Sequence, residues 1–79
     1  MPFEIHVESY AGHRGDEAPR AFVLAGERIL VTDVVDRWLA PDHRYFKVRS
    51  AAGDEFILRH DIVTGAWEIT FFKRNEARG

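Results

Sequence analysis

The chain has 79 residues, of which 46% are hydrophobic and 13% aromatic, with no cysteine and a net charge of −2. This length allows one domain, which we place at residues 1–79, and the hydrophobic content excludes a disordered tail. The lack of cysteine excludes disulfide bridges, thiolate nucleophiles and cysteine-ligated metals, and the small net charge is unlike that of a strongly basic nucleic-acid binder.

Alternation of apolar and polar residues predicts strands in the first half of the chain. The first strand covers residues 3–8, with its apolar side chains on one face. Residues 10–19 contain glycines, a proline and charges, which predicts a loop, and residues 20–24 form a short second strand. After a tight turn at residues 25–27, the β-branched residues of 28–38 predict the longest strand.

The alternation breaks inside that long strand, because Val31, Val34 and Val35 cannot share one face. A β-bulge would restore the pattern and bend the strand. A short helix over residues 34–39 is the alternative. Trp38 closes the apolar run, so we expect it to be largely buried.

Residues 40–43 form the next loop, and three clear strands follow it. Their registers follow from the requirement that apolar residues share a face. A three-residue loop that ends at Gly53 places Val48 opposite Phe56, and by the same count Phe46 opposite Leu58. Its last residue should be left-handed, a conformation that suits glycine.

A four-residue loop at 62–65 sets the last hairpin. It places Leu58 opposite Ile69 and Phe56 opposite Phe71. Trp67 then lies on the apolar face, where we expect it to be buried.

These elements predict an all-β domain of about six antiparallel strands in a meander. A lone three-stranded sheet would leave its apolar face in water, so the first strands must fold over it as a small barrel or a strongly curved sandwich. If the strands do not close fully, the sheet has two edges to which a partner strand can add.

The polar side of the last three strands carries the most interesting surface. The candidate interaction surface consists of Arg44, Tyr45, Lys47, Arg49 and Arg59. Cations interleaved with an aromatic ring can follow phosphates and stack on a base. The registers offer another interpretation, since they place Arg49 opposite Glu55 and Arg59 opposite Glu68.

We favour the paired interpretation. The registers place Tyr45, Arg59 and Glu68 in one row across three strands, where the arginine can lie on the tyrosine ring and meet the carboxylate. The next row is predicted to hold Lys47, Ile57 and Thr70. Arg59 is then a structural residue, and little positive charge is left to attract phosphate.

No motif predicts catalysis or a metal site. The four histidines, at positions 6, 13, 43 and 60, lack metal-ligand spacing. The first strand places His6 between two carboxylates on one face, but an open strand face is not a pocket. Asp33 and Asp36 are interpreted as solvent-facing. We therefore expect no catalytic, cofactor-binding or metal-binding residues.

One stretch of the chain resembles a known family. The matching pattern is Asp36-Arg37-Trp38-x-x-Pro41, then Arg44-Tyr45-Phe46-x-Val48, Gly53-x-x-Phe56-x-Leu58-Arg59-His60-Asp61 and Gly65-x-Trp67-x-Ile69. This resembles an uncharacterised bacterial family of small domains of unknown function, and is similar to a segment near the C-terminus of inactive, Y-family-polymerase-like mutagenesis proteins. The resemblance implies a β-rich accessory module linked to DNA repair, and it carries over no catalytic residue.

The first six residues contain neither a basic segment nor an apolar signal segment, and no apolar run approaches the ~20 residues that span a bilayer. We therefore expect a cytoplasmic protein with no membrane contact. The function predicted is a non-enzymatic accessory or protein-interaction module, without a cofactor. The alternative is a single-stranded nucleic-acid-binding module, and a small hydrolase or metal enzyme is the third candidate. The sequence leaves the oligomeric state open.

Overall fold

The computed structural model describes residues 3–11 and 17–75, which form six strands and no helix. The strands are β1 (Phe3–Ala11), β2 (Glu17–Leu24), β3 (Glu27–Leu39), β4 (His43–Ser50), β5 (Glu55–Asp61) and β6 (Trp67–Lys73). No helix in this part of the chain could cross a membrane.

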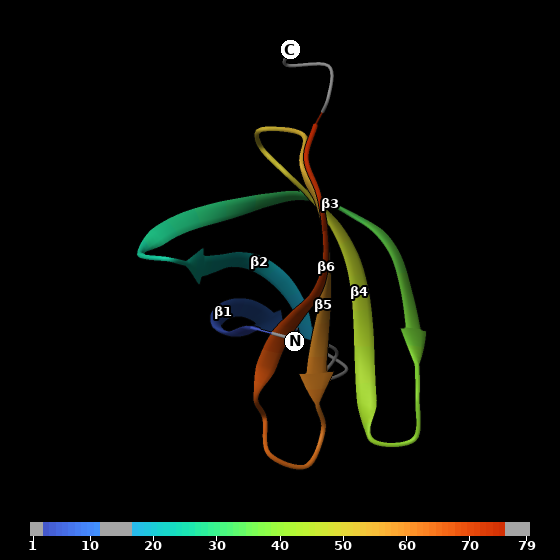
Figure 1. Cartoon of the computed structure of the whole chain (residues 1–79). Helices are drawn as coiled ribbons and strands as arrows, with labels where there is room; N and C mark the ends of the chain where they lie inside the picture. Colours follow the sequence, from blue (N-terminus) through green and yellow to red (C-terminus); the bar gives the residue numbers. More distant parts are fainter. Residues whose placement is uncertain (1–2, 12–16, 76–79) are drawn as a thin grey trace.

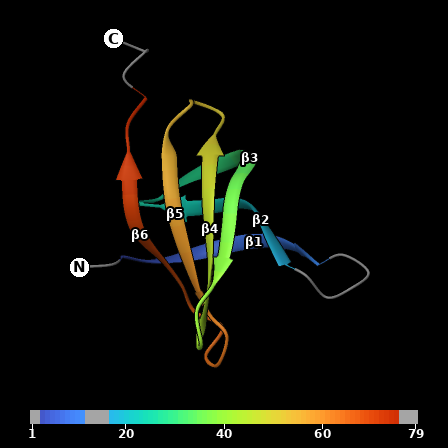
Figure 2. The ribbon, with the colours of Figure 1, turned by 90° about the vertical axis from the view of Figure 1, so that its right-hand side faces the viewer.

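The strands form a closed antiparallel barrel in chain order, which confirms the predicted fold class. The second half of β3 stands beside β4, β5 and β6, while β1 and β2 run across these upright strands (Figures 1 and 2). β3 bends so that its first residues pair with β2 and the rest with β4. The barrel closes through three residue pairs between β1 and β6. Of the two predicted forms, the structure has the barrel, and because these pairs join the ends of the sheet, the two open edges considered for an unclosed sheet are not formed.

The core lies between the crossing strands. Phe22 of β2 and Phe56 of β5 are both fully buried, with ring centroids 4.9 Å apart in an edge-to-face contact. Burial of each such side chain contributes about 1.5–3 kcal/mol. The buried apolar residues are Ile5, Ala21, Phe22, Phe46, Val48, Phe56, Leu58, Trp67 and Ile69.

β3 is a bulged strand, which excludes the alternative of a short helix. Its register against β4 shifts twice, between Val31 and Asp33 and again between Val34 and Asp36. Val31 and Val34 pack against the core, whereas Val35 is exposed. The second shift also turns Trp38 outward, where it is 40% exposed. The expected burial of Trp38 is therefore wrong.

The β4–β5 hairpin has the predicted register. Val48 lies opposite Phe56, and Phe46 lies opposite Leu58. Gly53 closes the loop with φ = 88°, in the left-handed region expected for that position. The loop is held by the buried Ser50, whose hydroxyl accepts a hydrogen bond from the backbone N–H of Asp54.

The β5–β6 hairpin follows the prediction only near its loop. Leu58 lies opposite Ile69 as expected, but the register then shifts. Phe72, rather than Phe71, lies opposite Phe56, and the two rings are 4.9 Å apart. The reason is an irregularity at Thr70, which inserts one residue and exchanges the faces of the residues after it.

The first hairpin is longer than predicted. β1 continues to Ala11 and β2 begins at Glu17, so the predicted loop at residues 10–19 is wrong at both ends. Its middle, residues 12–16, lies outside the described residues. Pro19 is tolerated in β2 because it lies beside a register shift and before the pairing with β3 begins.

The β2–β3 turn is one residue shorter than the predicted turn at residues 25–27. Ala25 and Gly26 form it with φ = 52° and φ = 80°, and Glu27 already pairs with Leu24. Two successive positive φ angles are typical of the type I′ hairpin turn, whose twist matches that of its strands.

Candidate interaction surface

Three cations and one aromatic residue of the predicted surface share the outer face of the sheet formed by β3–β6. Tyr45, Lys47 and Arg49 alternate along β4 with the buried core residues, and therefore face away from the barrel. Arg59 lies opposite Tyr45 on β5. Arg44 does not join them. Arg44 precedes the buried Phe46 by two residues, and alternate residues of a strand face the same side. It therefore lies on the concave face, which is the side turned toward β1 and β2.

Arg59 is held in the predicted row. Its pairing with Tyr45 on one side and Glu68 on the other is confirmed. The guanidinium Nε donates to Glu68 Oε1 at 3.0 Å, and a second nitrogen donates to the same oxygen. Hydrogen bonding to Glu68, and then to Tyr45, raises the pKa of Arg59. The positive charge of Arg59 is thus already matched by a carboxylate.

Lys47 and Arg49 share the carboxylate of Glu55. Arg49 donates to Glu55 at 3.0 Å, and the Lys47 ammonium lies 3.9 Å from the other oxygen. The hydrogen bond from Arg49 lowers the pKa of Glu55, and the positive charges nearby act in the same direction. Asp33 of β3 adds a carboxylate 3.9 Å from Arg49, so it faces a cation and not only solvent.

The row beside these ion pairs differs from the prediction. Lys47 lies opposite Ile57 as expected, but Phe71 takes the position predicted for Thr70. Phe71 is 44% exposed there.

Sequence reasoning missed an aromatic stack on this face. Trp38 of β3 lies opposite Tyr45, and their rings are parallel to within 3° with centroids 5.3 Å apart. Counting two bulges in β3 instead of one would have placed Trp38 outside. Two stacked rings, one of them half-exposed, form a rigid apolar surface.

Exposed apolar side chains also gather at the lower end of the sheet. By lower end we mean the loops at residues 40–42 and 62–66, at the bottom of Figure 1. The loops are joined by a hydrogen bond of 3.0 Å from the N–H of Ile62 to the carbonyl of Asp42. Leu39 is 76% exposed and Val63 is 81% exposed. Together with Trp38, the residues of this apolar tip are Trp38, Leu39, Ile62 and Val63.

The other titratable residues singled out in the sequence are either bonded within the chain or exposed. Glu8 forms a two-point ion pair with Arg28 at 2.7 and 2.8 Å, and this hydrogen bonding lowers the pKa of Glu8. Glu4 and His6 are exposed. Asp36 accepts a hydrogen bond from the backbone N–H of Arg37 at 2.8 Å.

The other histidines are dispersed. His43 lies 3.6 Å from Asp61, and His60 stacks on Trp67 with ring centroids 4.1 Å apart. His13 lies outside the described residues. Within residues 3–11 and 17–75, no three of His, Asp and Glu converge as metal ligands would.

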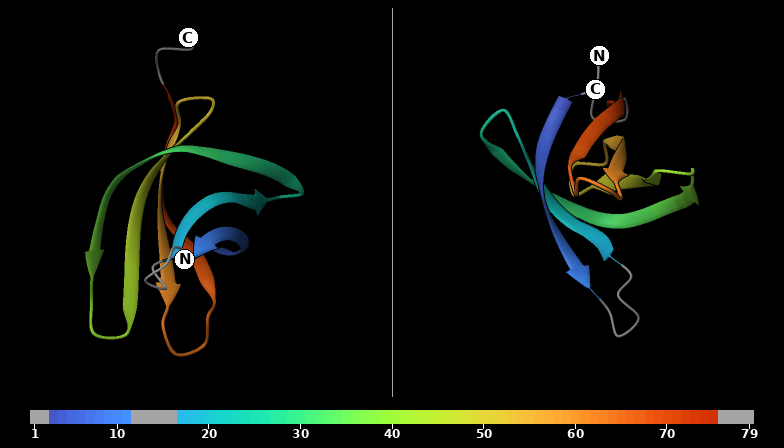
Figure 3. Two further views of the ribbon diagram at one scale, coloured as in Figure 1. Left: turned by 180° about the vertical axis from the view of Figure 1, so that it is seen from behind. Right: turned by 90° about the horizontal axis from the view of Figure 1, so that it is seen from below.

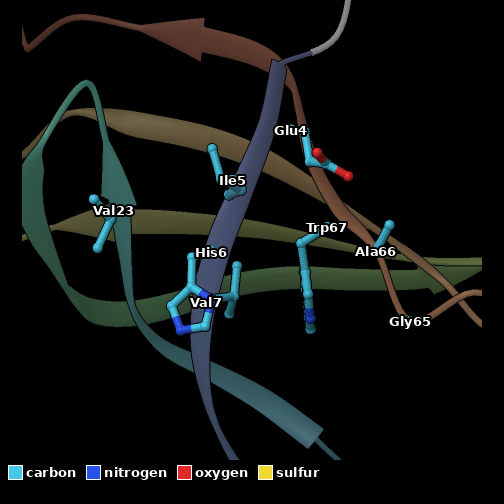
Figure 4. A pocket seen from close by; sticks show the side chains of 8 residues that line it. All are labelled: Glu4, Ile5, His6, Val7, Val23, Gly65, Ala66 and Trp67. Atoms are coloured by element: carbon cyan, nitrogen blue, oxygen red, sulfur yellow. The ribbon is translucent and has the colours of Figure 1, made fainter.

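A hollow lies in the angle between β1 and the lower end of β6 (Figure 4). Ile5 and Val7 line it from β1, and Gly65, Ala66 and Trp67 line it on the side of β6. Its lining is mixed, polar and apolar in about equal parts, and its polar residues Glu4 and His6 belong to the exposed side of β1.

Comparison of the chain with family models, with curated proteins and with solved structures finds no match.

Proposed function

We propose that this chain is a non-enzymatic binding module whose partner is a protein. The observation that carries the proposal is the apolar tip, where Trp38, Leu39 and Val63 are exposed although the barrel has a buried core of its own. Large apolar side chains that gather on a surface are a mark of protein interfaces. A tryptophan held by stacking is the type of residue that anchors them.

The charges of the outer face support a protein partner over a nucleic acid. A phosphate backbone is bound by cations that are free to replace its counterions. Lys47, Arg49 and Arg59 instead lie within 4 Å of carboxylates of the same chain. The net charge of −2 adds no general attraction to phosphate.

The proposal assigns no catalytic residue, because the carboxylates of the outer face are engaged in ion pairs with their neighbours. The pattern from Asp36 to Ile69 adds a biological expectation. Its resemblance to segments of mutagenesis proteins suggests a partner from a DNA-repair system.

Quantitative capture from a lysate of the source organism tests the proposal. We expect the wild-type protein to retain a partner that Trp38→Ser and Val63→Asp both lose, since each removes apolar contact from the tip. Phe71→Ser is the matched control, because it removes an equally exposed aromatic ring away from the tip. Capture should fall less with added salt than phosphate-driven binding does, as expected of a largely apolar interface.

Three outcomes would contradict the proposal. One is equal capture by the wild type and both tip variants. Another is binding of a labelled oligothymidine that falls steeply with salt, which would support the single-stranded nucleic-acid alternative. The third is stoichiometric zinc or iron in the purified protein together with hydrolytic activity, which would support the metal enzyme.

A further inference from the structure

Two arginines occupy the concave face of the sheet at its lower end. Arg37 lies opposite Phe46, with its guanidinium carbon 5.9 Å from the centroid of that ring. Arg44 precedes Phe46 by two residues on β4 and therefore faces the same way. The two arginines are diagonal neighbours across β3 and β4, a relation that places their Cα atoms about 7–8 Å apart.

These arginines differ from the cations of the outer face. Each of Lys47, Arg49 and Arg59 is in an ion pair. Among the residues that the structure describes, neither Arg37 nor Arg44 lies within ion-pair distance of a carboxylate.

The described residues directly opposite Arg44 carry no carboxylate either. Its neighbours across the strands are Leu39 on β3 and His60 on β5. Phe46 follows Arg44 by two residues on the same face of β4, and its ring lies 5.6 Å from that of Trp67. The arginine pair therefore faces apolar and imidazole groups.

The concave face is accessible at this end. β1 and β2 cross the sheet at a higher level, and the lower ends of β3–β6 extend past them (Figures 1 and 3). Arg37 and Leu39 are exposed, and Arg44 is half-buried. The hollow beside β1 reaches Trp67 (Figure 4). His60 stacks on the ring of Trp67.

We propose that Arg37 and Arg44 bind two carboxylates of an acidic, extended segment of the partner protein. This inference rests on the proposed function and names the chemistry of the partner. Alternate side chains of an extended strand are about 6.6–6.8 Å apart, which matches the spacing of the arginines. The guanidinium fork also fits a carboxylate in a two-point hydrogen bond.

The surroundings favour a peptide over a phosphate backbone. Leu39 lies opposite Arg44 and is exposed, so the arginine pair adjoins the apolar tip. An acidic segment with apolar residues could contact both. A nucleic acid would need a longer track of free cations than two arginines provide.

Fluorescence anisotropy with a labelled peptide Gly-Val-Glu-Val-Glu-Val-Gly tests the inference. We expect the wild-type protein to bind it, and to bind the Gln-for-Glu peptide at least about tenfold more weakly, since a hydrogen bond to a charged group contributes this much. Arg37→Gln and Arg44→Gln should each weaken binding of the Glu peptide by about tenfold. Lys47→Gln is the matched control on the outer face and should leave binding unchanged.

Arg44→Lys provides a second measurement that preserves the charge. We expect it to bind between the wild type and Arg44→Gln, because the ammonium keeps the attraction but not the fork. The circular dichroism spectra of all variants should match that of the wild type, since neither arginine is fully buried.

Several results would overturn the inference. These are no binding of the Glu peptide by the wild type, equal binding of the Gln peptide, or an equal loss in Lys47→Gln. Binding of oligothymidine that both arginine variants lose would assign the site to a nucleic acid instead. Tip-dependent capture of a protein that survives the double variant Arg37→Gln/Arg44→Gln would overturn the inference and leave the proposed function intact. If Trp38→Ser and Val63→Asp capture the partner as well as the wild type does, the proposed function itself is overturned.

Discussion

The two faces of the β3–β6 sheet place the same kinds of residue, arginine and tryptophan, in different surroundings. On the outer face, cations lie opposite carboxylates and Trp38 stacks half-exposed on Tyr45. On the concave face, Trp67 is 7% exposed and Arg44 has apolar and imidazole neighbours. The basic residues of this protein therefore indicate a binding surface only once their carboxylate partners are known. The most conspicuous basic stretch is paired with carboxylates, whereas Arg37 and Arg44 have no carboxylate within ion-pair distance among the described residues.

The largest expected effect separates the two tryptophans. Trp67→Ala should lower the free energy of unfolding by about 3–5 kcal/mol, as expected when a large buried side chain is removed. Trp38→Ala should cost about 1 kcal/mol or less, because the ring is half-exposed and loses mainly its stacking contact. Urea denaturation measures both values. Equal losses would contradict the assignment of the tryptophans to opposite faces.

Fluorescence provides a control in proteins that still fold. Trp38→Phe leaves only Trp67, whose emission should be shifted to shorter wavelength by its apolar surroundings. Trp67→Phe leaves only Trp38, whose emission should lie closer to that of tryptophan in water.

A smaller effect separates the arginines of the two faces. Arg59→Ala should lower the free energy of unfolding by up to about 1 kcal/mol, since it breaks a partly exposed pair with Glu68. Arg44→Ala should leave it unchanged or raise it slightly, because Arg44 loses no ion pair and its cationic neighbour Arg37 is relieved of repulsion. Chemical denaturation at low and high salt checks the sign. A larger loss for Arg44→Ala would mean that Arg44 is structural.

Where β1 pairs with β6, two negatively charged side chains lie opposite each other on the outside of the barrel. Glu4 lies opposite Glu68, and such pairs are destabilising. Glu4→Lys should raise the free energy of unfolding by about 0.2–1 kcal/mol. Glu27→Lys makes the same change of net charge at an exposed turn position, away from this strand pair, and serves as the control in the same thermal denaturation series. If both variants are stabilised alike, the effect comes from net charge and not from the pairing of β1 with β6.

The smallest expected effect is a dependence on acid pH. The pKa of Glu55 is lowered from its usual 4.5 by Arg49, so its contribution to stability is complete above 4.5 and is lost as the pH falls through the folded-state pKa. Glu55→Gln should therefore flatten the loss of stability below 4.5. Urea midpoints measured between about pH 6 and about pH 3 check this. An unchanged slope would indicate that Glu8 and Asp61, whose pKa values are also lowered, dominate the acid response.

The sequence prediction was most accurate for features that depend on residues close together in the chain. The β4–β5 register and the row of Tyr45, Arg59 and Glu68 are confirmed, because each depends on residues within one hairpin or two adjoining ones. The predicted partner of Phe56 is wrong, because one inserted residue at Thr70 changes every later pair. The candidate surface was therefore predictable except for Arg44, which lies on the opposite face.

By itself the sequence determined the all-β class, the strands and most hairpin turns, since alternation and left-handed glycines such as Gly53 act over a few residues. Only the tertiary structure decided how β1 meets β6, where β3 bulges, and hence the outward position of Trp38 and the concave position of Arg37. The physical reason is that a strand bends and bulges to close a barrel over a shared core. The residues that impose this closure, such as Ile5 and Trp67, are far apart in the chain.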